Sequence, residues 1–523
     1  MSRRTVLVLT TAVLLAGCAS PPADRPGGTD SPDQAEASAT LAAAAAVITA
    51  EDSRDYLAVL AHDSMMGRDS RRPEIWAAAR YIAAQFAAMG LEPLDQDGDF
   101  IAEYPIDIPE TDIAQVRMVV EGHGERLELQ CGQDFAIMPS VQVPSFTGVV
   151  VAPLVKHDWY RNNPGSIPNG SLVLAYGPTG SGGIAEGLRF MSWMENVEEA
   201  GANAVGMILP PGTPLEVIPA LAQQMAGNPR LDGPPMLMLP SATVEKIFAL
   251  SGSAAPELDP LEAIQRAPVT VTLQMPVTIR TITAPNVVAR LPGSGQADLA
   301  DVVLTAHFDH EPPGVPTAEG DSIYNGADDN ASGTVGLLEV ARAFSALQQQ
   351  HPTRSVVFAA VSAEEMGLLG SARLAEEGPA PATTTAADLN MDMLSRNGPD
   401  SLFVFGQTYS SLGAVFRDVL KSHPELGLEV RPGLQMPDLD LIRFSDQAPY
   451  MARGVPVLFF NSGFHPELHT PDDELELANT DKIARAARLM FFLAYAVADN
   501  PVDPVWTDAG RTRTEAMQRA LQR

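Results

Sequence analysis

The residues of this chain that are best suited to chemistry are histidines and carboxylates that recur in short polar clusters. Four clusters lie between His307 and Asp392, and a fifth follows farther along. Their sequences are AHFDH (306–310), YNGADDNASG (324–333), SAEEMGLLGS (362–371), LNMDM (389–393) and FHPELHTPDD (464–473). Imidazole and carboxylate groups are the ligands that zinc prefers, at distances of about 2.0–2.2 Å. The clusters therefore indicate a metal site, if the fold brings them together.

Several of these clusters come directly after a run of apolar residues. DVVLTA ends at His307, SVVFAAVS ends before Glu364, and VPVLFF (455–460) precedes the fifth cluster. Short apolar runs that alternate with helical patterns are typical of βαβ units and a mostly parallel sheet. Open sheets of this kind bind their ligands beyond the carboxyl ends of the strands. We therefore expect an α/β fold with a mostly parallel (mixed) central sheet, helices on its faces and the metal site at one sheet edge.

The residues in the clusters are sufficient for two metal ions. Two ions about 3.5–4 Å apart need terminal ligands for each ion and one group that bridges them. A carboxylate suits the bridging position because its two oxygens can bind different ions. Glu364 is then left over as a base. The five candidate ligands are His307, Asp329, Glu365, Asp392 and His469.

Each of these residues has an ordinary structural explanation when it is considered alone. A histidine such as His307 after a strand is more often a core residue, and the pair Asp328–Asp329 is more often a turn or a helix cap. The metal prediction therefore depends on the clusters taken together. His310 and His465 lie beside the clusters, and we expect them to flank the site or lie on the surface rather than to bind metal.

The five motifs, in this order, resemble those of the co-catalytic di-zinc aminopeptidase and glutamate carboxypeptidase family. The resemblance covers most of residues 48–500 once an insertion is allowed for, and it implies two Zn²⁺ ions per chain. It further implies that His307 and Asp392 bind one zinc and that Glu365 and His469 bind the other. Asp329 would bridge the two ions.

The same resemblance implies roles for two further carboxylates. Asp309 would accept a hydrogen bond from the second nitrogen of His307 and fix the orientation of the ring. Glu364 would take a proton from the attacking water and pass it to the leaving amine. The substrates would be peptides or proteins.

The chain departs from the family pattern at one position of the site. Many members have a tyrosine directly before the distal histidine, where its hydroxyl can stabilise the oxyanion of the tetrahedral intermediate. Leu468 occupies that position here. Either a metal ion or another residue would then have to stabilise the oxyanion, and Tyr450 is a weak candidate.

The leading interpretation is an exported, lipid-anchored zinc exopeptidase, most simply an aminopeptidase that hydrolyses amino-terminal peptide bonds. A carboxypeptidase or a glutaminyl-cyclase-like enzyme on the same fold is the first alternative, since family cyclases work with one zinc. A receptor-like binding protein without catalysis is the second alternative. It is disfavoured because all the candidate ligand positions are filled.

The resemblance and the composition together divide the chain into segments. The predicted peptidase domain is discontinuous and consists of residues 48–125 and 278–500. Residues 126–277 are rich in Pro and Gly and lack the metal-type clusters. Their strand, helix and strand patterns resemble the protease-associated domain. Residues 501–523 are predicted to form a polar, peripheral tail.

The amino-terminal residues indicate export. Two arginines precede a short apolar run, which is the pattern of a signal peptide. Leu15–Cys18 (LAGC) resembles a bacterial lipobox, so we predict a signal peptide over 1–17, lipidation of Cys18 and a flexible tether over 18–47. The expected location is the cell envelope, and Ala19 after the cysteine is typical of the outer membrane, facing the periplasm, in a Gram-negative host.

Charge and cysteine content restrict the partners. The formal net charge of −31 argues against nucleic acid, whose phosphates would be repelled. Membrane contact is expected only through the lipidated amino terminus. Cys131 is the only other cysteine, so the mature chain has no internal disulfide.

Overall fold

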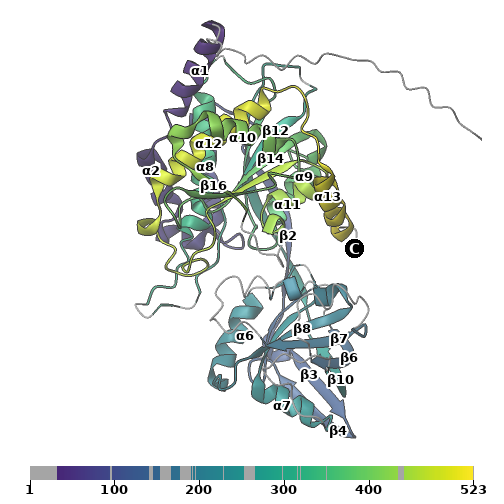
Figure 1. Cartoon of the computed structure of the whole chain (residues 1–523). Coiled ribbons are helices and arrows are strands. Elements are labelled where there is room, and N and C mark those ends of the chain that lie inside the picture. The colour runs from purple at the N-terminus through teal and green to yellow at the C-terminus, as the bar shows by residue number, and fades with distance from the viewer. Residues whose placement is uncertain are drawn as a thin grey trace, which may run out of the picture.

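The computed structural model describes residues 32–94, 97–140, 145–152, 167–176, 190–252 and 265–521, except for positions 191, 195, 228, 232, 297, 315, 318–319, 349 and 434–440. The predicted signal peptide and Cys18 therefore lie outside the described residues. The chain forms two lobes, each built on its own sheet, and β2 runs between them (Figure 1).

The first lobe is built on a mixed sheet of nine strands. Its order is β1-β11-β13-β12-β14-β17-β15-β16, and β2 pairs with β11. The four central strands β13, β12, β14 and β17 are parallel to one another. The sheet confirms the expected α/β fold. The strands are β1 (Glu92–Pro93), β2 (Ile101–Glu110), β11 (Thr278–Leu291), β12 (Asp301–His307), β13 (Val356–Val361), β14 (Thr385–Met391), β15 (Ser401–Phe405), β16 (Glu429–Pro432) and β17 (Val457–Asn461).

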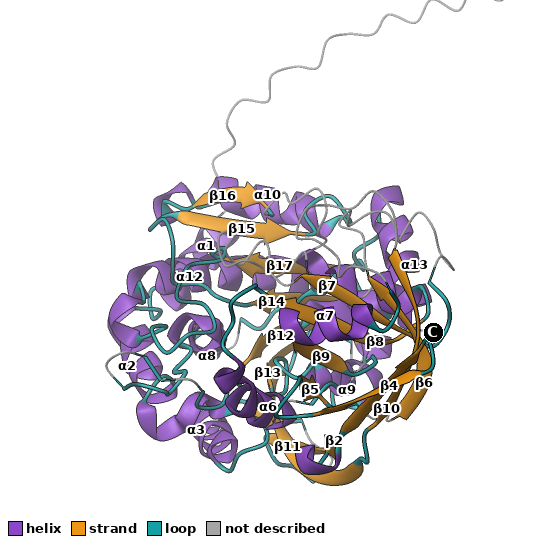
Figure 2. Ribbon diagram, turned by 90° about the horizontal axis from the view of Figure 1, so that it is seen from below, coloured by secondary structure: helices purple, strands orange, loops and turns teal. Residues whose placement is uncertain are grey.

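Strands β13 and β14 are buried along their whole length, which explains the continuous apolar sequence of β13. Side chains that alternate along β13 enter two different cores: Val356 and Phe358 pack on one face, Val357 and Ala359 on the other. Helices cover both faces (Figure 2). The first face is covered by α2 (Ala50–Leu60), α3 (Glu74–Ala88), α8 (Gly333–Ser345), α10 (Leu412–Ser422) and α12 (Thr480–Ala498), and the second by α9 (Leu369–Glu377), α11 (Gln447–Ala452) and α13 (Asp508–Leu521).

The second lobe is built on an eight-stranded sheet with the order β4-β3-β10-β6-β7-β8-β9-β5. Residues 196–199 are helical, as the sequence patterns predict. Strands β6, β7, β8 and β9 are parallel. The other elements are β3 (Arg117–Gly122), β4 (Glu125–Gln130), β5 (Ala136–Met138), β6 (Ser145–Ala152), β7 (Ser171–Tyr176), β8 (Ala202–Leu209), α6 (Ile218–Gly227), β9 (Met236–Pro240), α7 (Ser241–Ala249) and β10 (Gln265–Gln274).

The second lobe begins earlier in the chain than the predicted boundary at residue 126. Strand β3 starts at Arg117 and pairs along its length with β10, so it belongs to the second sheet. The long antiparallel pair of β2 and β11 carries the chain into and out of this lobe, with Glu110 opposite Thr278. The inserted lobe therefore occupies the chain between these two strands.

Both ends of the described chain are more ordered than expected. Part of the segment predicted to be a flexible tether forms α1 (Pro32–Ala45), and Ala44 and Ala45 are buried in the core of the first lobe. Part of the predicted tail forms α13, whose Met517 packs against the second face of the sheet. Among the described helices, none is long and apolar enough to cross a membrane.

Candidate metal centre

The predicted ligands lie where the central parallel strands end. His307 is the last residue of β12, Glu364 and Glu365 follow β13, and Asp392 follows β14 directly. The loop after β17 carries His469. Asp329 lies in the irregular turn Ala327–Ser332 that leads into α8. The carboxyl ends of parallel strands share one sheet edge, so these side chains converge as the sequence predicts.

The distances between the ligand atoms define two positions that share Asp329. His307 Nε2 lies 3.4 Å from Asp329 Oδ1 and 3.4 Å from Asp392 Oδ1. His469 Nε2 lies 3.0 Å from Asp329 Oδ2 and 3.4 Å from Glu365 Oε2. Two atoms that bind one zinc tetrahedrally at about 2.0–2.1 Å lie about 3.3 Å apart. This spacing is therefore compatible with metal ligands around each histidine, with Asp329 common to both groups.

A further observation supports a metal ion at the first position. Asp392 Oδ1 is buried and has no hydrogen-bond partner within the described part of the chain. A buried carboxylate oxygen without a partner is costly unless a cation neutralises it. The ligand atoms of His307 and Asp329 lie near this oxygen, and the three residues together fit a divalent cation.

The two neighbouring glutamates have opposite electrostatic surroundings. Burial acts to raise the pKa of Glu365, but the charge of His469 and hydrogen bonds from His310 and His469 outweigh it and hold that pKa well below its usual range. Burial raises the pKa of Glu364 well above its usual range, although the charge of His307 opposes it. The two adjacent carboxyl groups therefore have pKa values shifted in opposite directions.

The two ligand histidines differ in exposure. The His307 side chain is 1% exposed, whereas that of His469 is 44% exposed. The centre is therefore closed on the sheet side and open to solvent on the His469 side.

The Asp309 carboxylate makes a different contact from the hydrogen bond to His307 that the sequence predicts. His307 Nδ1 is 3.2 Å from the main-chain carbonyl of Asp309, while its distance to the Asp309 carboxylate is 3.7 Å. The carboxylate instead accepts a hydrogen bond of 3.2 Å from the main-chain N–H of Glu364. Asp309 thus links the His307 strand to the loop that carries Glu364, and the predicted side-chain bond to His307 is wrong.

Tyr450 does not replace the tyrosine that is missing at Leu468. Its side chain is fully buried in the core beneath the second face of the sheet, and its hydroxyl donates a hydrogen bond of 2.7 Å to the carbonyl of Ala380. The hydroxyl is therefore engaged away from the ligand cluster. This part of the sequence interpretation is wrong.

Two buried residues that the sequence interpretation did not select organise the loops of the site. The Asp473 carboxylate accepts hydrogen bonds from the main-chain N–H groups of Asp328 and Asp329 at 3.0–3.1 Å. Arg68, which is fully buried, donates to four carbonyls at 2.6–3.0 Å, and these belong to Leu60, Phe308, Asn325 and Gly326. Neither residue belongs to a spacing pattern that marks a ligand, so no local signal identified them.

His310 and His465 are buried rather than on the surface. His465 lies 3.4 Å from Asp328, behind the bridging residue. His310 lies inside the cluster itself, with Nδ1 2.9 Å from Glu365 Oε1. A surface position is therefore excluded for both, and His310 belongs to the same group of possible ligands as Asp329, Glu365 and His469 rather than flanking it.

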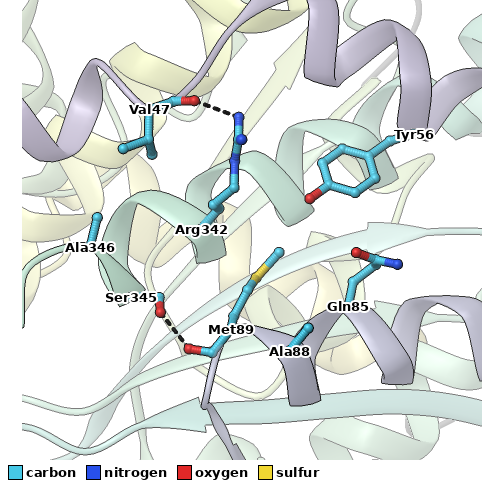
Figure 3. Close-up of a pocket in the computed structure, with 8 residues that line it drawn as sticks. All are labelled: Val47, Tyr56, Gln85, Ala88, Met89, Arg342, Ser345 and Ala346. Carbon is cyan, nitrogen blue, oxygen red and sulfur yellow. Dashed lines mark hydrogen bonds between the residues drawn. The ribbon is translucent and has the colours of Figure 1, made fainter.

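A separate pocket of about 480 Å³ lies on the helical face of the first lobe (Figure 3). Its most polar side chain, Arg342, is engaged by the carbonyl of Val47 and by Asp52 and Glu339. The residues that line it contain neither a histidine nor a carboxylate, so the pocket is not part of the metal centre. They are Val47, Tyr56, Gln85, Ala88, Met89, Arg342, Ser345 and Ala346.

The fold and the centre together define an α/β domain of the zinc-exopeptidase type. Residues 286–494 match the model of peptidase family M28, and this segment contains every candidate ligand. The chain therefore carries a peptidase family M28 domain.

Individual relatives agree with this assignment. A probable zinc metalloprotease of Pyrenophora tritici-repentis is 25% identical over 43% of this chain and 53% of its own length. Aminopeptidase YwaD of Bacillus subtilis is 24% identical over 39% of this chain and 42% of its own length. The chain thus spans about half the length of the curated relatives it matches.

A solved structure shares the fold. The aminopeptidase from Aneurinibacillus sp. strain AM-1 superposes with a TM-score of 0.52 at 18% sequence identity, over 88% of this chain and 96% of that one.

Proposed function

We propose that this protein is a zinc-dependent exopeptidase, most simply an aminopeptidase, with two zinc ions per chain. The observation that carries the proposal is the position of Asp329, whose two carboxylate oxygens face different histidines. A bridging carboxylate between two imidazoles serves a pair of cations. Relatives that are named aminopeptidases and zinc metalloproteases support the reaction class.

His307, Asp392 and Asp329 would hold one ion, and Glu365, His469 and Asp329 the other. When bound, such a pair polarises a peptide carbonyl and lowers the pKa of water. Glu364 stands next to a proposed ligand, where it would accept the proton of the attacking water and deliver it to the leaving amine. The hydrogen bond from the main-chain N–H of Glu364 to the Asp309 carboxylate fixes the position of that base at the sheet edge.

Oxyanion stabilisation would depend on the cations, because Leu468 has no donor and the Tyr450 hydroxyl is engaged elsewhere. A missing oxyanion donor costs other enzymes about 2.7–4 kcal/mol. We therefore expect slower turnover than in family members that have the tyrosine, with unchanged metal binding.

We also propose a cellular location for the protein and a domain type for its second lobe. Residues 1–17 would be removed as a signal peptide, and lipidated Cys18 would anchor the protein in the cell envelope, at the outer membrane if the host is Gram-negative. The lobe between β2 and β11 would be a protease-associated-like domain, which its strand and helix order supports. Mass spectrometry of the amino-terminal peptide after expression in a bacterial host tests the lipid on Cys18.

A panel of substrates tests the main proposal. Aminoacyl-arylamides and amino-blocked peptides are incubated with the full chain, with added zinc and with a chelator, and zinc is counted by atomic emission. We expect about two zinc ions per chain and cleavage of free amino termini only. Cleavage of blocked peptides would favour a carboxypeptidase, while one zinc and cyclisation of amino-terminal glutamine would favour the cyclase alternative.

A further inference from the structure

His310 is a third histidine inside the metal centre, and no role has been assigned to it so far. Its side chain is fully buried. Nδ1 lies 2.9 Å from Glu365 Oε1 and 3.8 Å from Asp329 Oδ2. Its ring meets that of His469 edge-on, with 5.3 Å between the ring centroids. The geometry admits two roles: a fourth protein ligand of the His469-side ion, or a hydrogen-bond donor to Glu365.

The second nitrogen of each ring distinguishes these roles. A histidine that binds metal through one nitrogen carries a proton on the other and usually donates it to a carboxylate or carbonyl. His307 presents Nε2 to the centre, and its Nδ1 lies 3.2 Å from the carbonyl of Asp309. His469 also presents Nε2, and its Nδ1 lies 3.4 Å from Glu311 Oε1. Both predicted ligands therefore have a partner for the second proton.

His310 lacks such a partner among the described residues. It presents Nδ1 to the centre, and its Nε2 is buried without a hydrogen bond. If Nδ1 bound metal, Nε2 would carry a proton and leave a buried donor unsatisfied, which proteins avoid. If Nδ1 carries the proton, it donates to Glu365 and Nε2 is only an unused acceptor. The second tautomer leaves no buried donor without a partner.

The distances agree with this choice. The 2.9 Å between His310 Nδ1 and Glu365 Oε1 is the usual length of an N–H···O hydrogen bond. The other oxygen, Oε2, is the one that faces His469 at 3.4 Å, the spacing of two ligands on one ion. The two oxygens of Glu365 are thus divided between a histidine donor and a metal position.

We infer that His310 is a positioning residue: its Nδ1–H donates to Glu365 Oε1, so that Glu365 would bind its ion through Oε2 alone. This inference rests on the proposed function, because it assigns a role within the same centre. Its consequence is that the His469-side ion keeps three protein ligands and an open position for water or substrate, as a catalytic zinc requires.

The backbone fixes the ring in this orientation. A Cβ atom on Gly326 would lie 2.6 Å from two atoms of the His310 ring, so the ring packs closely against a glycine. Gly326 has a left-handed φ of 55° and its carbonyl accepts a hydrogen bond from Arg68. The ring therefore has little freedom to turn toward a different partner.

The test uses the full chain loaded with zinc and two substitutions. In His310→Asn the amide nitrogen can replace Nδ1 as a donor, whereas His310→Leu keeps the volume without a donor. We expect His310→Asn to retain two zinc ions per chain and most of the turnover. We expect His310→Leu to bind zinc at one of its two positions about 10–100-fold more weakly, since that is the usual effect of removing a group that orients a ligand.

X-ray absorption spectroscopy of the wild-type zinc protein supplies a readout that does not depend on activity or on the variants. Two ligand histidines on two ions give an average of one imidazole per zinc, and a third would give one and a half. An average near one and a half, or loss of one zinc in His310→Asn, would overturn the inference, as would unchanged zinc affinity in His310→Leu. Failure of the wild-type protein to bind zinc would instead overturn the proposed function.

Discussion

The Asp473 carboxylate holds the main chain of Asp329, since its Oδ2 accepts the N–H of that residue at 3.0 Å. Asp473 lies four positions after His469 and is fully buried. It also accepts the N–H of Asp328, and its own carbonyl accepts the N–H of Ala327. One side chain therefore ties the loop that carries a terminal ligand to the turn that carries the bridging ligand.

Replacement of Asp473 by Asn should loosen that connection without creating a cavity. An amide has only one oxygen, and its NH₂ group would face the N–H donors of the turn, so the bridging carboxylate loses its fixed position. We expect zinc affinity to fall about 10–100-fold, measured by competition with a chromogenic chelator. Asp472→Asn is the matched control, because Asp472 is exposed and should leave affinity unchanged. Equal affinities in the two variants would contradict the role of Asp473.

Glu364→Gln should separate catalysis from metal binding. The change keeps the size of the side chain and removes the group that accepts a proton, so turnover should fall about 10²–10⁴-fold. The zinc content should remain that of the wild-type protein because Glu364 is not one of the proposed ligands. The measurements are kcat on an aminoacyl-arylamide and metal content on the same sample. Retention of full turnover would exclude Glu364 as the base.

Arg68→Met should destabilise the protein far more than a surface arginine does. Four main-chain carbonyls lose their donor, and each unsatisfied buried group costs about 1–3 kcal/mol. We expect a loss of at least about 2 kcal/mol in the free energy of unfolding, read from the urea midpoint. Arg72→Met is the control, since Arg72 makes one half-exposed ion pair with Glu74 at 3.4 Å and should change stability by less than about 1 kcal/mol. Similar midpoints for both variants would disagree with this account.

Lys482 gives the protein a pH dependence of stability on the alkaline side. Burial lowers the pKa of this fully buried lysine to about 8, although Asp328 and Asp400 oppose the shift, and Nζ donates to the carbonyl of Arg396 at 2.6 Å. The pKa in the unfolded chain is about 10.4. Between these two values the unfolded chain binds the additional proton, so stability rises with pH from about 8 to about 10.4 and changes little with this group below about 8.

The slope of that rise can be isolated with Lys482→Met. The free energy of unfolding of the wild type minus that of the variant should increase between pH 7.5 and pH 9.5, by up to about 1.4 kcal/mol per pH unit. Other titrating groups are common to both proteins and cancel in the difference. A difference that stays constant over this range would show that Lys482 is not titrating there.

The sequence by itself located the sheet edge and the residues that meet there. His307 and the Glu364–Glu365 pair follow apolar runs that are too continuous to be exposed strands, so parallel pairing and convergence at one edge followed. Asp329, Glu365 and His469 belong to polar clusters whose order along the chain is distinctive. Local sequence carries this information because a strand and the residue after it are neighbours in the chain.

The limits of the two lobes were less predictable. Strand β3 reads like any other short strand, and only its pairing with β10, some 150 positions later, assigns it to the second sheet. Helices α1 and α13 have alanine-rich or polar sequences that resemble linkers. Their order comes from packing against the first lobe, which contacts distant in sequence supply.

Tertiary structure alone decided which of several equivalent residues serves the centre. Asp472 and Asp473 are adjacent and chemically identical, yet one is exposed and the other holds the bridging turn. His310 and His307 share a cluster, yet they present different nitrogens to the ligand group, and within the described part of the chain only His307 has a partner for its second nitrogen. The type and spacing of residues determine what chemistry is available. The direction in which each side chain points is set by contacts between loops far apart in the chain, and these exist only once the fold has formed.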